Sequence, residues 1–255
     1  MDPETVYEFT ADLKAGSCDA TACWRADAML VALQDAAGEH ATRLGAGFHT
    51  LLKQNLAWIL TRTRLEIDAC PTFLRPVTVR TWTGKERHGI YPRYFTFTDE
   101  YGQVFGRAVS LWALMELTDR RLVLPEESQI KLPADASPAP CRAPKSIRIP
   151  EGEPAVRSTR RPVYSELDVN RHLNNTRYLS WLCDLLPASF FETKQFASLN
   201  ISYLHEIRPK DEVSLSLYRT EKGCCFTGYT GDILCFAAEA EVKDKKVIPV
   251  PDDAE

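Results

Sequence analysis

An internal duplication constrains the fold of this chain more than any other feature of its sequence. Residues 125–162 hold eight of the sixteen prolines, a composition typical of a linker. Before this stretch, apolar periodicity predicts a helix and then four strands, at 25–43, 57–67, 77–83, 93–99 and 104–117. After it the same order returns, at 174–185, 197–205, 211–220, 224–230 and 233–242. The chain is therefore expected to contain two equivalent units, each a helix followed by an antiparallel meander.

The first predicted helix indicates how each unit is packed. Its start, residues 28–33, reads AMLVAL and is apolar on every face, which indicates that a sheet wraps around it. A helix enclosed by a curled antiparallel sheet is the hot-dog arrangement. We therefore predict an α+β chain with a tandem (double) hot-dog fold, in which two long helices are each wrapped by a curled antiparallel sheet. Two unrelated α+β domains remain the alternative, since a helix followed by a meander is a common order.

The proline-rich stretch also sets the expected domain boundaries. We predict an N-terminal hot-dog domain at 1–137, a linker at 138–156 and a C-terminal hot-dog domain at 157–255. Because single hot dogs dimerise through an interface that a double hot dog already contains, a monomer or a homodimer is expected.

Composition narrows the functional classes. With 26% charged residues and a net charge of −4, the chain is typical of a soluble globular protein and not of a nucleic-acid binder. No apolar run approaches the roughly 20 residues that span a bilayer, and no basic-then-apolar leader opens the chain. The eight cysteines form no CxxC pair and lie near no His at metal-ligand spacing. We therefore expect no metal, no cofactor, no membrane span, and a reducing, cytoplasmic setting with free thiols.

One short stretch concentrates residues that carry chemistry. Asp168, Asn170 and His172 occupy alternate positions just before the second apolar helix, where an extended backbone would aim all three the same way. The unpaired N–H groups at the start of that helix could stabilise an oxyanion beside them. Judged alone, an Asp or Asn here is usually a helix cap, and we assign that role to Asn174 and Asn175. The shared spacing instead favours a catalytic cluster, and since the region before the first helix lacks it, one site is expected.

The same stretch resembles a known family. Residues 168–181, DVNRHLNNTRYLSW, are similar to the segment that opens the second hot-dog helix of the fatty acyl-ACP thioesterases of plants and bacteria. Further landmarks of that family resemble segments of the first half, at 33–37, 58–60, 65–67, 79–82 and 99–102. The resemblance covers nearly the whole chain and implies a hydrolase of fatty acid biosynthesis that releases free fatty acid from acyl carrier protein.

The resemblance also implies a set of catalytic residues. Asp168, Asn170 and His172 match the family motif directly, and Glu206 has the place of a fourth member, a Glu on the strand that leaves the helix region. Plant members carry a Cys directly after this Glu, whereas Ile207 stands here, so a thiol nucleophile at that position is excluded. We expect the cluster to activate a water molecule, with Glu206 as general base or as carboxylate nucleophile.

Two further sites are expected. In the family the first hot dog houses the acyl chain, which suggests a tunnel beside Met29, Leu30 and Leu33. Acyl carrier protein is acidic, so docking requires basic groups, and residues 139–178 hold eight Lys or Arg against four acids. The members that we expect to dock the carrier are Arg160, Arg161, Arg171 and Arg177.

Other functions fit the same pattern. The nearest are an acyl-CoA thioesterase and a hot-dog hydratase that uses an Asp and a His on an enoyl thioester. A third is a non-catalytic module that binds acyl thioesters. The pairing of Asn170 with Glu206 favours hydrolysis over hydration, and four converging polar residues are more than binding alone requires.

Overall fold

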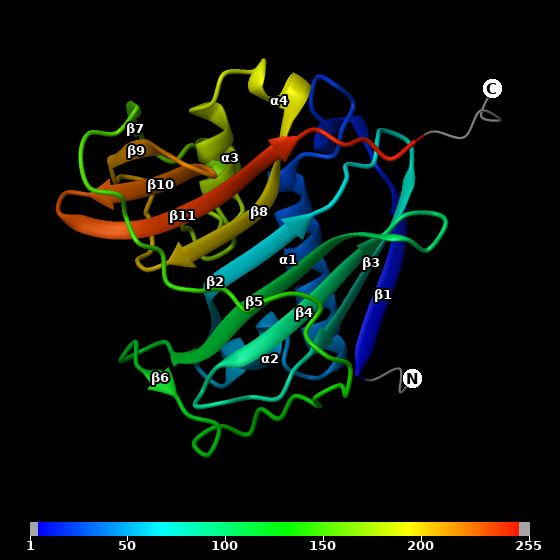
Figure 1. Cartoon of the computed structure of the whole chain (residues 1–255). Coiled ribbons are helices and arrows are strands. Elements are labelled where there is room, and N and C mark those ends of the chain that lie inside the picture. Colours follow the sequence, from blue (N-terminus) through cyan, green and yellow to red (C-terminus); the bar gives the residue numbers. More distant parts are fainter. Residues whose placement is uncertain (1–4, 250–255) are drawn as a thin grey trace.

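The computed structural model describes residues 5–249 (Figure 1). The N-terminal half comprises β1 (Val6–Asp12), α1 (Ala26–Arg43), α2 (Phe48–Lys53), β2 (Leu56–Ile67), β3 (Pro76–Thr83), β4 (Tyr91–Thr98), β5 (Val104–Glu116) and β6 (Leu122–Val123). The C-terminal half comprises β7 (Val156–Arg160), α3 (Arg177–Asp184), α4 (Phe190–Thr193), β8 (Lys194–Tyr203), β9 (Val213–Thr220), β10 (Gly223–Thr230) and β11 (Ile233–Asp244). All eight predicted strands are present, with ends that differ from the prediction by at most three residues.

The two halves share one antiparallel sheet. Its order is β1-β3-β4-β5-β2-β8-β11-β10-β9-β7, and β6 pairs with β5. The halves meet where β2 pairs with β8, from Arg62 opposite Ser202 to Glu66 opposite Ser198. The curled sheets of the two halves therefore form one continuous sheet, because backbone pairing continues across the boundary. The linker at 138–156 stays a prediction, and no strand lies between Val123 and Val156 in the described chain.

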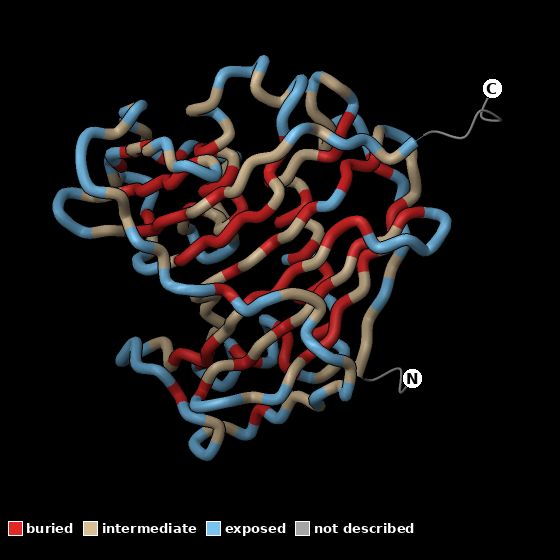
Figure 2. The backbone as a smooth tube through the Cα atoms, viewed as in Figure 1, coloured by how far each residue is buried: buried red, intermediate tan, exposed pale blue. Residues whose placement is uncertain are grey.

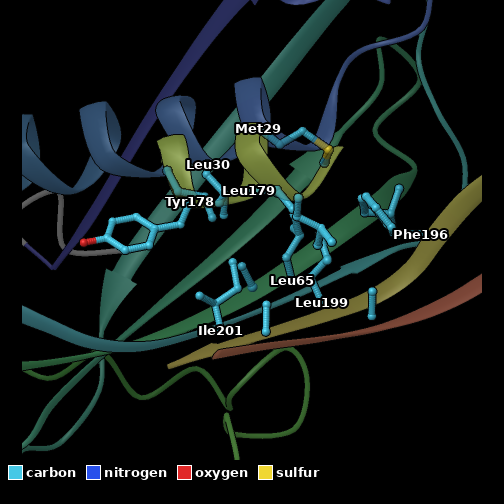
Figure 3. Close-up of a cluster of buried hydrophobic side chains, with 14 of the residues drawn as sticks. Met29, Leu30, Leu65, Tyr178, Leu179, Phe196, Leu199 and Ile201 are labelled. Carbon is cyan, nitrogen blue, oxygen red and sulfur yellow. The ribbon is translucent and has the colours of Figure 1, made fainter. Parts of the chain in front are cut away.

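The core lies between the helices and the centre of this sheet. Figure 3 shows Met29 and Leu30 of α1, and Leu179 of α3, against side chains of β2 and β8. Leu65 of β2 and Leu199 of β8 are fully buried there. Buried positions follow the inner strands and exposed ones the loops (Figure 2). Each fully buried side chain of this size contributes about 1.5–3 kcal/mol, so this contact holds both halves together.

The two helices differ in length. Helix α1 has 18 residues and ends where Gly45, at a φ of +72°, lets the backbone leave the helix. Helix α3 has only eight, so the prediction of two long helices is wrong for the second. Its first turn is lost because the Asn174 side chain accepts the Thr176 N–H at 3.0 Å, and Pro187 prevents its continuation. Within the described residues, no helix is long and apolar enough to cross a membrane.

Candidate active site

The polar residues predicted from the motif line one cavity. It has a volume of about 440 Å³, and Asp168, Asn170, His172 and Glu206 all contribute to its wall. The opposite wall comes from the N-terminal half, through the start of β2 and the turn that follows β5. The site therefore lies at the seam between the two halves.

The motif forms a tight loop and not the predicted extended run. The Asp168 Oδ1 atom accepts the backbone N–H groups of Asn170 at 2.8 Å and of His172 at 3.0 Å. The Asp168 N–H in turn donates to the His172 carbonyl at 2.8 Å, and Arg171 takes a left-handed φ of +63°. Asp168 is thus the residue that holds this loop together, while Asn170 and His172 remain open to the cavity.

Glu206 enters the cavity from the segment after β8. The Leu204 and His205 N–H groups both donate to the Cys235 carbonyl, at 2.9 and 3.0 Å, which fixes this segment on β11. The next residue, Ile207, is fully buried and its carbonyl accepts the Leu173 N–H at 2.8 Å. This last bond ties the segment that carries Glu206 directly to the motif loop.

The carboxylate and the imidazole face each other. His172 Nε2 lies 3.4 Å from Glu206 Oε2, and the two side chains are 25% and 28% exposed. A carboxylate, an imidazole and the Asn170 amide at one cavity can hold a water molecule, accept its proton and donate to a developing oxyanion. The structure thus brings together all four residues that the sequence indicated.

Arg120 is a member of this site that sequence reasoning missed. Its Nη2 lies 2.7 Å from Glu206 Oε1, whereas His172 faces the other carboxylate oxygen, Oε2. Arg120 has a left-handed φ of +53° in the turn between β5 and β6. The Glu116 carboxylate organises this turn, because it accepts backbone N–H groups from residues 118 and 119 at 3.1 and 2.7 Å. No local signal could have found Arg120, which is 86 positions from Glu206 in the sequence.

Two tyrosines complete the cavity wall. The rings of Tyr178 and Tyr203 meet edge to face, with centroids 5.5 Å apart. Burial raises the pKa of both phenols above the ordinary value of tyrosine. Figure 3 shows the Tyr178 hydroxyl directed away from the apolar cluster. Both phenols therefore stay protonated and can only donate or accept neutral hydrogen bonds.

A second, mostly apolar cavity adjoins the first. It measures about 190 Å³ and shares Ala57, Trp58 and Asn170 with the polar cavity. Its helical wall is formed by residues of α1 at one-face spacing, namely Gln34, Ala37, Gly38 and Ala41. The polar cavity and the apolar space of the N-terminal half therefore share part of their wall at Asn170.

The residues predicted to line an acyl tunnel lie elsewhere. Met29 is 1% exposed and packs in the core, where its methyl group lies against Gly106. Leu30 and Leu33 border only a small space of about 20 Å³. The larger apolar cavity begins at Gln34, the residue after Leu33, because the first turns of this helix face the crowded centre of the sheet.

The predicted docking arginines do not gather as one free basic patch. Arg160 pairs with Asp184 and Arg161 pairs with Glu212, each at 2.8 Å, so carboxylates offset both charges. Arg177 borders a different cavity, next to α1. Arg171 is exposed at the tip of the motif loop. Within residues 5–249, no group of three or more His, Cys, Asp or Glu is placed to hold a metal ion.

Comparison with known proteins identifies two matching family models. The model described as "Acyl-ACP thioesterase N-terminal domain" matches residues 4–130, and "Acyl-ACP thioesterase C-terminal domain" matches residues 153–233. The palmitoyl-acyl carrier protein thioesterase of Arabidopsis thaliana is 30% identical over 237 residues, which is 88% of this chain and 55% of that protein. The dodecanoyl-[acyl-carrier-protein] hydrolase of Umbellularia californica is 29% identical over 79% of this chain and 56% of its own length. The chain spans about half the length of the curated relatives it matches.

Solved structures agree with these matches. An acyl-ACP thioesterase from Bacteroides thetaiotaomicron superposes with a TM-score of 0.85 at 25% identity, covering 93% of this chain and 98% of that one. The 12:0-ACP thioesterase from Umbellularia californica gives a TM-score of 0.85 at 23% identity, covering 94% and 98%. The predicted α+β double hot-dog fold is thereby confirmed.

Proposed function

The chain belongs to the acyl-ACP thioesterase family, and from this premise we propose that it hydrolyses the thioester of a fatty acyl-acyl carrier protein and releases free fatty acid. The observation that carries the proposal is the facing pair of His172 and Glu206, 3.4 Å apart, at a cavity that shares the Asn170 side of its wall with an adjoining apolar cavity. A polar reaction centre next to an apolar space suits a substrate with a reactive head and a hydrocarbon tail.

The first step is attack by water. A water molecule between Glu206 and the thioester carbonyl carbon gives a proton to the carboxylate as its oxygen forms the new C–O bond. His172 orients this water from the other side, and Arg120 keeps the carboxylate in place through Oε1. Because Ile207 provides no thiol, the carboxylate performs this step, as general base or, alternatively, as the nucleophile.

The second step is collapse of the tetrahedral intermediate. Its oxyanion needs donors, and the side-chain NH₂ group of Asn170 is available where the two cavities share a wall. The C–S bond then breaks, and the departing carrier thiolate takes the proton that Glu206 received. Atoms and charge balance, and Glu206 returns to its ionised form.

The acyl tail is proposed to lie in the apolar cavity of about 190 Å³. This location replaces the one predicted beside Met29, Leu30 and Leu33, while keeping the tail in the N-terminal half. Gly38 belongs to the helical wall of this cavity, and a larger side chain at this position is proposed to shorten the space for the tail.

The carrier is proposed to approach at the mouth of the polar cavity. Arg120, which pairs with Glu206 and has 51% of its side chain exposed, lines this cavity, and Arg171 is exposed on the tip of the motif loop. Of the four arginines expected from the sequence, Arg171 thus keeps a docking role in the proposal. The eight cysteines are all free thiols, in keeping with a proposed cytoplasmic location.

One incubation tests the proposal. Purified protein is given acyl-ACP, acyl-CoA or enoyl-CoA, and free thiol is measured with a chromogenic disulfide reagent. We expect thiol release from acyl-ACP at the highest kcat/KM. Faster release from acyl-CoA would replace the proposed substrate, water addition to enoyl-CoA would indicate a hydratase, and binding without thiol release would indicate a non-catalytic module.

A further inference from the structure

The N-terminal half contains a second copy of the active-site loop. Residues 18–24 fold as residues 167–173 do, although the two sequences share little besides an aspartate. In each loop the carboxylate of Asp19 or Asp168 accepts the backbone N–H groups two and four residues further on, at 2.8 and 3.0 Å in both cases. The residue three positions after each aspartate has a left-handed φ, +62° and +63°. The duplication therefore extends to the geometry of the site.

This correspondence identifies the equivalents of the reacting pair. Cys23 occupies the position of His172, four residues after the aspartate. In the N-terminal half the Trp24 N–H donates to the Pro71 carbonyl, just after β2, at 3.0 Å. In the C-terminal half the Leu173 N–H donates to the Ile207 carbonyl, just after β8, at 2.8 Å. The residues directly before those carbonyls are Cys70 and Glu206. A pair of thiols thus stands where the other half has an imidazole and a carboxylate.

The surroundings of the thiol pair also correspond. Cys70 borders a cavity of about 380 Å³, together with Asp19 and Lys245. Lys245 comes from the segment after β11, and its Nζ lies 3.1 Å from Asp19 Oδ2 with only 8% of the side chain exposed. Arg120, after β5, reaches the other site but pairs there with Glu206, the counterpart of Cys70. Each site therefore receives one cation from the opposite half.

The two thiols differ in acidity, and Cys70 Sγ lies 3.5 Å from Gln195 Oε1. A hydrogen bond from Cys70 lowers the pKa of the Cys23 thiol, and the nearby Lys245 ammonium lowers it further. The same hydrogen bond, together with burial, raises the pKa of Cys70. Burial also raises the pKa of other thiols in the chain, namely Cys18, Cys141, Cys183, Cys224 and Cys225. Among these thiols, Cys23 is the one whose pKa is lowered, although its side chain is buried.

We propose that Cys23 and Cys70 are a redox-modification site, which a two-electron oxidant of the peroxide class converts to a disulfide. The Cys23 thiolate attacks one peroxide oxygen, the O–O bond breaks, and a sulfenic acid and a hydroxide form. The Cys70 sulfur then attacks the Cys23 sulfur, the S–O bond breaks, and the hydroxide released takes the Cys70 proton as water. The two sulfurs lose two electrons together, and the peroxide is reduced to two waters. A dithiol reductant reverses the change.

The test uses the full-length protein and hydrogen peroxide. After treatment and denaturation, we expect the number of titratable thiols to fall from eight to six and to return to eight with dithiothreitol. Trypsin should release residues 15–25 linked to residues 65–80, at a mass two hydrogens below the sum of the two peptides. Residues 15–25 also contain Cys18, so the Cys18→Ser variant is the matched control and should keep the link.

Variants of the pair decide the outcome. Cys23→Ser and Cys70→Ser should each lose the linked peptide, and Cys70→Ser should retain a sulfenic acid on Cys23 that dimedone traps. If either serine disturbs folding, the corresponding alanine variant replaces it, with circular dichroism as the check. The proposal is overturned if peroxide oxidises other cysteines while these two peptides stay unlinked, or if the link persists in Cys23→Ser. Neither result bears on thioester hydrolysis, because the pair lies outside the Glu206 cavity.

Discussion

Replacing Glu206 with glutamine separates the chemical role of this residue from its structural role. Glutamine has nearly the same shape, and its carbonyl oxygen can still accept a hydrogen bond from Arg120, 2.7 Å away in the wild-type pair. It cannot accept a proton from water, however, and its NH₂ group would face the His172 ring, where Oε2 now lies at 3.4 Å. The substitution thus removes the base and leaves the packing of the cavity wall intact.

The expected magnitudes differ for rate and stability. Loss of a general base lowers turnover by roughly 100-fold or more, equivalent to about 2.7 kcal/mol of barrier. Glu206 and its two partners are all partly exposed, and pairs of that kind contribute about 0.2–1 kcal/mol each. In a chain of this size 1 kcal/mol corresponds to about 2–4 °C in Tm, so Tm should fall by only a few degrees.

The assay is thiol release from acyl-ACP at saturating substrate, with the melting temperature measured on the same preparations. Glu212→Gln is the matched control, since Glu212 also pairs with an arginine, Arg161 at 2.8 Å, but lies outside the cavity. We expect this control to retain wild-type turnover. If Glu206→Gln were as active as Glu212→Gln, Glu206 would have no part in proton transfer and the mechanism would need another base.

Three further changes test the remaining parts of the site. His172→Ala should lower turnover by roughly 100-fold, and unchanged turnover would show that Glu206 orients water alone. Arg120→Gln should lower kcat by about tenfold, because the Glu206 carboxylate loses its fixed position. Arg120→Lys should restore part of the lost kcat. Equal kcat in the wild type and both Arg120 variants would refute a positioning role. Gly38→Leu places a side chain where a Cβ meets no atom within 4 Å, so it should raise helix stability by about 1 kcal/mol and shift released fatty acids to shorter chains. An unaltered product profile, measured by gas chromatography, would place the acyl tail elsewhere.

The duplication has given the two halves different roles in the proposed reaction. The C-terminal half carries the motif loop and Glu206, while the apolar cavity lies in the N-terminal half. The seam at β2 and β8 brings the two spaces together, with Trp58 of β2 bordering both. One loop geometry supports an imidazole in one half and a thiol in the other, since the aspartate and the backbone alone define it.

Local signals in the sequence determined most of the secondary structure. Alternating apolar residues marked the strands within a few positions, as in β4, where buried and partly exposed residues alternate from Tyr91 to Thr98. The motif at 168–172 could be recognised from the sequence because its loop depends on hydrogen bonds only two and four residues apart. The length of α3 was not predictable in this way, since Asn174 serves equally well as a helix cap or as a turn residue.

The sequence by itself determined the repeated helix-and-meander units and the residues that could carry chemistry. Only the tertiary structure decided what those residues face. Pairing of β2 with β8 joins the strands of both halves in a single sheet. Arg120 of the N-terminal half pairs with Glu206 of the C-terminal half. The charges of Arg160 and Arg161 are offset by carboxylates. The reason is physical: periodicity and turns depend on neighbours in the chain, whereas cavities and ion pairs depend on side chains that only long-range strand pairing brings together.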